Sequence, residues 1–245
     1  MCMALTPMNW FPNWRLLLAD RIPVLDARLS AAAAFVRPHS SVADIGCDHG
    51  KLSAYLALEK HCRVVAADIR PTPLARARET MRHYACEERV QCRLGDGLSV
   101  LSAGEVETIV IAGVSGITAC NIMTACPFPL EIGARFIFVP PTKHAYLRGW
   151  LWRHGFSLVD ETPVLAAGRV YTAMCWEYTA QEKHADAFSC AVGKTVKPTA
   201  ASRAYLEHVA LLARKYARGV KEPEQQADIL VLASRVEQEA EKCKA

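Results

Sequence analysis

The stretch Val42-Ala43-Asp44-Ile45-Gly46-Cys47-Asp48-His49-Gly50 decides the fold, because an apolar run leads through a turn with two glycines into a helical segment. Glycine has no Cβ, so Gly46 and Gly50 let the backbone pass close to a bound ligand. The turn has too few glycines for a G-x-G-x-x-G pyrophosphate loop, and no Lys-Ser/Thr pair follows as in a P-loop. The stretch therefore predicts a strand, a turn and a helix that bind a ligand without phosphate groups.

Strand-like runs alternate with helical segments from about residue 41 onward. The first five runs are Ser41–Gly46, Arg63–Ile69, Val90–Leu94, Thr108–Ala112 and Arg135–Val139. The accompanying segments with helical spacing are Leu52–Glu59, Pro73–Cys86, Ser115–Met123 and Lys143–His154. Strands that alternate with helices in this way predict a parallel sheet with right-handed crossovers.

Two further runs, Phe156–Val164 and Val170–Glu177, are separated only by the short link Leu165–Arg169, which contains a glycine. Such a short link predicts an antiparallel hairpin. Five parallel strands followed by a β-hairpin are the pattern of the Rossmann-like class I methyltransferase fold rather than of an NAD-binding dehydrogenase. We therefore expect an α/β protein with a seven-stranded, mostly parallel sheet.

The chain is expected to divide into three parts. Residues 1–23 show no clear period, residues 24–180 form the α/β domain, and residues 181–245 form a coiled-coil-like helical hairpin. The hairpin is indicated by two apolar stripes with helical spacing, separated by Gly219 and Pro223. The residues expected to face one another are Leu206, Val209, Ala213 and Tyr216 on one arm, and Ile229, Leu232, Ala233 and Val236 on the other.

Acidic residues stand at the carboxyl ends of the first three predicted strands. S-adenosylmethionine, the methyl donor of this fold class, carries a positive sulfonium and amino group, so Asp44 is a suitable partner. The spacing from Asp44 to Asp68 is close to the roughly 20 residues that place an acid on ribose hydroxyls, and Asp96 is expected to contact the adenine amino group. The predicted cofactor-binding residues are Asp44, Gly46, Asp68, Ile69, Gly95, Asp96, Gly97 and Gly113.

The composition is compatible with a reduced cytoplasmic protein. The 245 residues carry a formal net charge of +4, which permits a nucleic-acid partner without demanding one. The ten cysteines form no C-x-x-C pair, and the histidines show no metal-ligand spacing, so neither a disulfide scaffold nor a metal site is expected. No stretch has the pattern of a signal peptide or a membrane span.

Charge is unevenly distributed over the predicted hairpin, with a basic first arm and an acidic second arm. One interpretation is a solvated hairpin whose two faces are complementary. The other is a basic arm that docks on phosphates through Arg214, Lys215 and Arg218.

These motifs resemble the bacterial tRNA (adenine-N1)-methyltransferases of the TrmK type, which modify adenine 22 of tRNA. The similarity is carried by LDARL (Leu25–Leu29), VADIGCDHGKLSAYL (Val42–Leu56), RLGDGL (Arg93–Leu98), ETIVIAG (Glu107–Gly113), LRGWLWRHG (Leu147–Gly155), Glu161 and Gly168–Tyr171. It implies an S-adenosylmethionine-dependent tRNA methyltransferase with a helical C-terminal domain.

Two segments depart from the family pattern. The family usually has Ile-Ala-Gly-Met-Gly-Gly where this chain has Val114 and Ser115 in place of Met-Gly, and Gln-Pro-Asn where this chain has Pro140-Pro141-Thr142. Both segments are expected to border the methyl-transfer site. The predicted walls for the target base are therefore Val114, Ser115, Pro140, Pro141 and Thr142.

Methylation of adenine N1 needs alignment more than a strong base, since N1 has a free lone pair. The product ring is cationic, so a carboxylate or other acceptor near it would stabilise the developing charge. Asp48 and His49 are the predicted catalytic residues. The alternatives are that Asp48 is the N-cap of the following helix and that His49 has a packing or backbone hydrogen-bonding role.

Two other functions stay open at this point. The enzyme could methylate another RNA or a small molecule, given the changes near Ser115 and Thr142. A non-catalytic RNA-binding relative is the other option, although the three acids Asp44, Asp68 and Asp96 argue against it.

Overall fold

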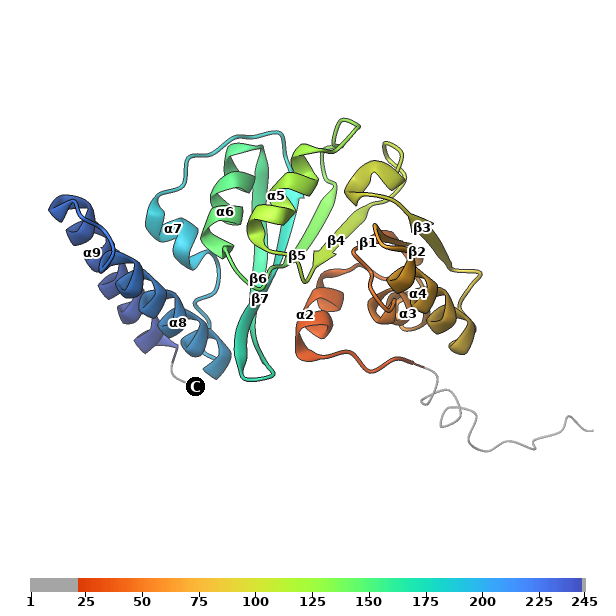
Figure 1. Cartoon of the computed structure of the whole chain (residues 1–245), viewed down its shortest axis with the longest axis horizontal. Helices are drawn as coiled ribbons and strands as arrows, with labels where there is room; N and C mark the ends of the chain where they lie inside the picture. The colour runs from red at the N-terminus through yellow and green to blue at the C-terminus, as the bar shows by residue number, and fades with distance from the viewer. Residues whose placement is uncertain (1–21, 244–245) are drawn as a thin grey trace, which may run out of the picture.

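The computed structural model describes residues 22–243, and within this range the chain forms a seven-stranded sheet flanked by helices (Figure 1). The order across the sheet is β3-β2-β1-β4-β5-β7-β6. The strands are β1 (Ser41–Ile45), β2 (Arg63–Asp68), β3 (Val90–Leu94), β4 (Thr108–Ala112), β5 (Arg135–Val139), β6 (Phe156–Ala166) and β7 (Arg169–Tyr178). Of the predicted N-terminal extension, residues 1–21 lie outside the described range.

Strands β1 to β5 pair in parallel, whereas β7 pairs antiparallel with both β5 and β6. The predicted fold class is thereby confirmed, including the hairpin at the edge of the sheet. Strand order reverses between β1 and β4, which are neighbours although β2 and β3 separate them in the sequence. In open α/β sheets such a switch point leaves a crevice at the carboxyl ends of the strands, where ligands bind.

Helices cover both faces of the sheet. The helices are α2 (Ala27–Phe35), α3 (Lys51–Leu58), α4 (Pro71–His83), the short 3₁₀ helix η1 (Gly97–Val100), α5 (Gly116–Thr124), α6 (His144–Arg153), α7 (Ala187–Val192), α8 (Ala200–Ala217) and α9 (Pro223–Lys242). The buried side chains of α2, α3 and α4 join one hydrophobic core, and those of η1, α5 and α6 join a second core on the other face. None of these helices is long and apolar enough to cross a membrane.

Helices α8 and α9 form the predicted C-terminal hairpin at the end of the molecule opposite β3 (Figure 1). The prediction that Tyr216 faces the second arm is wrong, because its side chain is 65% exposed. Ala210 and Ala217 occupy the buried positions beside Leu206 instead. Leu206, Ala210 and Ala217 follow one another at steps of four and seven residues, which keep them on one face of the helix, and Tyr216 lies one position away from this stripe.

A buried arginine joins the hairpin to the α/β domain. Arg148 of α6 is fully buried, and its Nε donates to Glu161 Oε1 of β6 at 2.8 Å. Its Nη1 donates to the carbonyl oxygens of Cys190 and Ala191 in α7 at 2.9 Å each, and its Nη2 donates to Tyr205 Oη of α8 at 3.0 Å. One guanidinium therefore connects four elements.

The close approach of α7 to this arginine requires a glycine. Gly193 has a φ of 58°, and a Cβ built on it would overlap the Glu161 carboxylate and lie 2.6 Å from Arg148 Nε. Position 193 therefore has to stay free of a side chain for the ion pair to form.

We expect the substitution Arg148→Met to lower the free energy of unfolding by about 3–5 kcal/mol, because it leaves the buried Glu161 carboxylate without its partner. Chemical denaturation measures this change. The control is Arg203→Met, which removes an exposed ion pair with Glu207 and should leave the unfolding midpoint unchanged. Adding Glu161→Leu to Arg148→Met should recover part of the loss. No recovery would indicate that lost packing, and not the stranded carboxylate, causes the destabilisation.

Candidate functional site

A cavity of about 790 Å³ opens at the carboxyl ends of β1, β2 and β4. It contains all eight predicted cofactor residues, and Asp48, His49 and Val114 also line it. A second hollow of about 840 Å³ lies at the amino ends of the strands, lined by Ser41, Arg63 and Val90 among others. None of the strand-end acids lies there, so the cavity at the carboxyl edge is the candidate site.

Asp44 is the most buried acid of this cavity, with 3% of its surface exposed. Its Oδ2 accepts a hydrogen bond from Ser53 Oγ at 2.6 Å. Burial raises the pKa of the Asp44 carboxyl from 3.8 to about 6, although the hydrogen bond from Ser53 opposes the shift. A bound cation would stabilise the ionised carboxylate, so this position suits a positively charged group of a ligand.

Two turn glycines leave open space beside Asp44. Gly46 and Gly113 have φ values of 77° and 85°, and a Cβ built on either would meet no atom within 4 Å. They follow β1 and β4, the neighbours at the switch point. The space that side chains would fill at these two turns is therefore free for a ligand.

Asp68 holds the turn after β1 in place. Its Oδ1 accepts from the backbone N–H of Arg70 at 2.9 Å, and its Oδ2 accepts from the backbone N–H of Asp48 at 3.3 Å. Each oxygen keeps a further lone pair for a ligand hydroxyl. The acid predicted to bind a ribose thus also fixes the backbone that carries the predicted catalytic residue.

The alternative that Asp48 caps the following helix is wrong. The N-cap of α3 is Gly50, whose φ is 70°, and no side chain caps this helix. Asp48 itself has a φ of 49°, which is uncommon for a residue other than glycine. Its side chain is 61% exposed, and the one ion-pair partner that the described residues give it is His49 Nε2, 3.6 Å from Oδ2. The Asp48 carboxylate is therefore available to a substrate.

Another part of the cavity wall combines an acid with apolar surface. Asp96 precedes η1 without capping it through its side chain. Ile69 is 59% exposed, and Ile122 of α5 lines the same cavity. A cavity wall that combines a carboxylate with two aliphatic side chains suits a flat ring that carries an amino group.

The two loops predicted to contact the substrate base lie side by side. The backbone N–H of Gly116 donates to the Thr142 carbonyl at 2.9 Å. Ser115 is the N-cap of α5, since its Oγ accepts from the backbone N–H of Thr118 at 3.1 Å. Val114 and Thr118 line the cavity, whereas Ser115 and Pro140–Thr142 do not. The latter residues stand next to the cavity rather than in its wall.

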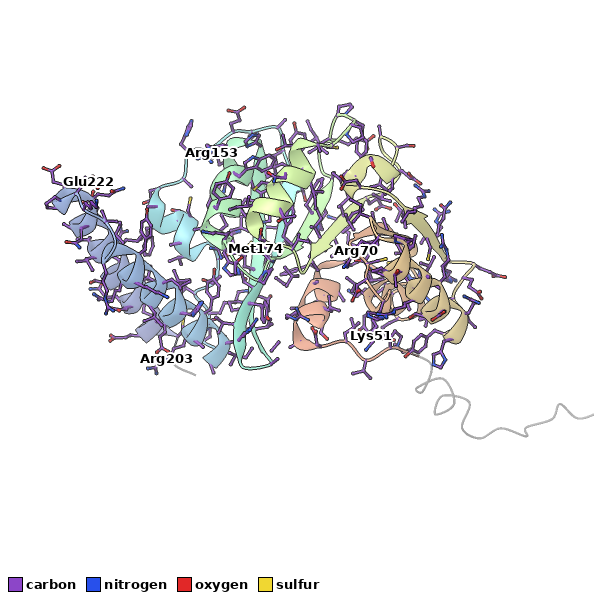
Figure 2. The ribbon with its side chains drawn as sticks, viewed as in Figure 1. Lys51, Arg70, Arg153, Met174, Arg203 and Glu222 are labelled. Atoms are coloured by element: carbon purple, nitrogen blue, oxygen red, sulfur yellow. The ribbon has the colours of Figure 1, made fainter. Side chains whose placement is uncertain are left out.

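Several residues of the cavity wall carry no signal in the strand-end pattern. They are Asp26, Arg28 and Leu29 around the start of α2, Lys51 and Arg70 after the first two strands, and Thr118 and Ile122 on α5. Figure 2 shows Lys51 and Arg70 on the part of the molecule formed by α3 and α4. Asp26 to Leu29 lie within the LDARL motif, so the resemblance contained a signal for them. No sequence signal indicated that Ile122 of α5 would line the cavity.

The three basic residues of the hairpin that were predicted to bind tRNA differ in their surroundings. Arg214 Nη2 and Glu237 Oε2 form an ion pair across the hairpin at 2.6 Å, whereas Lys215 and Arg218 are exposed near the hairpin tip. Figure 2 shows Arg203 and Glu222 toward opposite ends of this hairpin. Part of the basic arm is therefore neutralised by the acidic arm, as the first interpretation of the charge pattern required, and Lys215 and Arg218 remain for a partner.

Both the sequence and the fold are similar to those of known proteins. The chain is 27% identical over 221 residues to the tRNA (adenine(22)-N(1))-methyltransferase of Bacillus subtilis (strain 168), covering 90% of this chain and 91% of that protein. The crystal structure of the B. subtilis M1A22 tRNA methyltransferase TrmK has a TM-score of 0.74 at 24% identity and covers 91% of this chain and 100% of its own.

A further solved structure is that of M. capricolum TrmK in complex with S-adenosyl-homocysteine, with a TM-score of 0.74 at 18% identity. It covers 90% of this chain and 99% of its own. Residues 25–174, well over half of the sequence and including the whole cavity, match the family model described as a methyltransferase domain. The chain therefore belongs to the methyltransferase-domain family.

Proposed function

We propose that this protein is a TrmK-type enzyme that transfers a methyl group from S-adenosylmethionine to N1 of adenine 22 in tRNA. The observation that carries the proposal is one cavity that joins a buried acid, two further strand-end acids and two open glycine turns. The B. subtilis tRNA (adenine(22)-N(1))-methyltransferase, which is similar over 90% of this chain, supports the substrate.

The residues of the cavity fit the methyl donor. Asp44 would bind its amino group, Asp68 its ribose hydroxyls and Asp96 its adenine amino group, while Gly46 and Gly113 leave the space that it needs. When bound, S-adenosylmethionine supplies an electrophilic methyl group on a sulfonium. The protein's task is then to hold the acceptor nitrogen in line with that methyl group.

Asp48 and His49 are the proposed catalytic residues. Adenine N1 attacks through a lone pair and becomes cationic, so no proton has to be removed from it. The exposed Asp48 carboxylate would stabilise the positive charge that develops on the ring. Because N1 lies on the Watson–Crick edge, the adenine must be unpaired or flipped out of its stack to enter the cavity.

The tRNA would meet two further groups of residues. Val114, Ser115 and Pro140–Thr142 would border the base, and Lys215 and Arg218, with Arg214, would contact tRNA phosphates.

All nine cysteines between residues 22 and 243 are free thiols, in keeping with the cytoplasm, where tRNA is modified. Residues 22–243 contain no cluster of three potential metal ligands, and the proposed chemistry needs no metal ion.

Methylation of another RNA or of a small molecule is the second candidate. It is favoured by the Pro140-Pro141-Thr142 segment, which replaces the Gln-Pro-Asn of the family at the loop beside the base. Both candidates use the same cofactor residues, so only the acceptor distinguishes them.

Labelled S-adenosylmethionine and unmodified tRNA provide the direct test. We expect label to enter tRNA and nucleoside analysis to yield 1-methyladenosine, whereas the same tRNA with guanosine at position 22 should stay unlabelled. A different methylated nucleoside would overturn the proposed acceptor. No incorporation, with the cofactor still bound, would favour the second candidate or the non-catalytic RNA-binding relative.

Cofactor affinity should depend on pH through Asp44. Because the pKa of its carboxyl is about 6, Asp44 loses its negative charge as the pH falls through 6, and a ligand ammonium then binds less tightly. Calorimetry with S-adenosylhomocysteine should show affinity rising up to about pH 7 and then levelling. Asp44→Asn should weaken binding about 10- to 100-fold at pH 8 and abolish most of this pH dependence. If the asparagine variant had the same affinity as the wild type, Asp44 would not belong to the cofactor site.

Charge reversal on the hairpin tests the tRNA surface. Lys215→Glu combined with Arg218→Glu should weaken tRNA binding at every tRNA sequence. It should also lower the slope of log affinity against log salt by about 1 for each phosphate that the variant no longer neutralises. The matched control is Arg76→Glu with Arg82→Glu, two exposed arginines of α4 at the other end of the molecule. Equal effects of the two pairs would show that net charge, and not the hairpin, determines the affinity.

A further inference from the structure

The loop from Pro140 to Lys143, which we call the substrate loop, is fixed on one side by the turn after β4. The Gly116 N–H donates to the Thr142 carbonyl, and the Lys143 carbonyl lies so close to Gly116 that a Cβ there would overlap it. The loop also starts α6, since the Leu147 N–H donates to the Lys143 carbonyl at 3.1 Å. These contacts set the distance between the substrate loop and the cavity.

A histidine fixes the other side of the substrate loop. His144 Nε2 lies 2.9 Å from the Pro140 carbonyl oxygen, so the ring closes the loop back on its own first residue. Burial, together with the neighbouring Arg148 charge, lowers the pKa of His144 to about 4. The ring is therefore neutral at neutral pH, and a carbonyl acceptor requires the tautomer that carries its proton on Nε2.

The hairpin supplies the surface on which this histidine rests. The ring of Tyr205 of α8 meets the His144 ring edge to face, with centroids 5.4 Å apart and an interplanar angle of 77°. Tyr205 is fully buried, and its hydroxyl accepts from Arg148 Nη2 at 3.0 Å. A continuous chain of contacts thus runs from the Arg148 guanidinium through Tyr205 and His144 to the Pro140 carbonyl.

We propose that His144 is a positioning residue, through which helix α8 of the hairpin holds the substrate loop in register with the methyl-transfer site. The inference rests on the proposed function, and it adds a role for the hairpin besides binding RNA. His144 does not touch the substrate in this scheme. It acts through the Pro140 carbonyl, and a shift of about 1 Å in a positioning element can cost on the order of 100-fold in rate.

Two substitutions separate the hydrogen bond from the ring. His144→Phe keeps the aromatic contact with Tyr205 but removes the donor to Pro140, whereas the glutamine amide in His144→Gln can still donate to that carbonyl. We expect His144→Phe to lower kcat for tRNA methylation about 10- to 100-fold, with KM for tRNA and the affinity for S-adenosylhomocysteine within about twofold of wild type. His144→Gln should restore most of kcat.

The matched control lies at the other end of the same helix. His154 Nδ1 lies 2.7 Å from the Trp150 carbonyl oxygen, and its ring stacks on Trp150 with centroids 3.8 Å apart. His154→Phe therefore removes the same kind of ring-to-carbonyl hydrogen bond, away from the substrate loop, and kcat should stay unchanged. Equal kcat for the two phenylalanine variants, or a glutamine variant as slow as His144→Phe, would overturn the proposal.

Hydrogen exchange gives a readout that does not depend on activity. The amide of Gly116 should exchange faster in His144→Phe than in wild type or His154→Phe, because its acceptor on Thr142 is no longer held. Unchanged exchange would contradict the positioning role. If wild-type protein methylates no tRNA, the proposed function falls, and the exchange experiment still decides whether His144 fixes the loop.

Discussion

The arrangement of the α/β domain and the C-terminal hairpin depends on the hydrogen bonds that the buried Arg148 guanidinium donates. A buried charge is costly unless it is paired and its donors are satisfied, and Arg148 meets four acceptors at 2.8 to 3.0 Å. These acceptors belong to β6, α7 and α8, so none of these elements can shift without leaving a donor unpaired. The hairpin is thereby attached rigidly to the same helix that follows the substrate loop.

The cofactor cavity depends on topology rather than on a single contact. Because β1 and β4 are neighbours, the turns at Gly46 and Gly113 open onto one crevice, and β2 brings Asp68 to its side. The hydrogen bond from the Asp48 N–H to Asp68 then ties the first turn to the second strand. The Asp68 carboxylate, proposed to bind the ribose, thus also fixes the backbone of Asp48, which is proposed to stabilise the developing charge.

Sequence patterns predicted the parts of this structure that are local. The strands, the edge hairpin and the strand-end acids are each encoded by a few adjacent residues, so they could be found without coordinates. The wrong predictions concern features that depend on contacts with residues from other parts of the chain. Asp48 was a possible cap because acids often cap helices, but Asp68 and the conformation of Gly50 decide otherwise. The exposure of Tyr216 depends on the register of two helices, which spacing within one helix does not specify.

The departure from the TrmK-type pattern at Ser115 falls where the backbone tolerates it. Ser115 replaces a glycine at a φ of −62°, which any residue adopts, and its hydroxyl caps α5. Gly113 has a φ of 85°, and Gly116 has no room for a Cβ against Lys143; both glycines are retained. The turn after β4 therefore keeps both glycines that its backbone requires, while Ser115 adds a hydroxyl that caps α5.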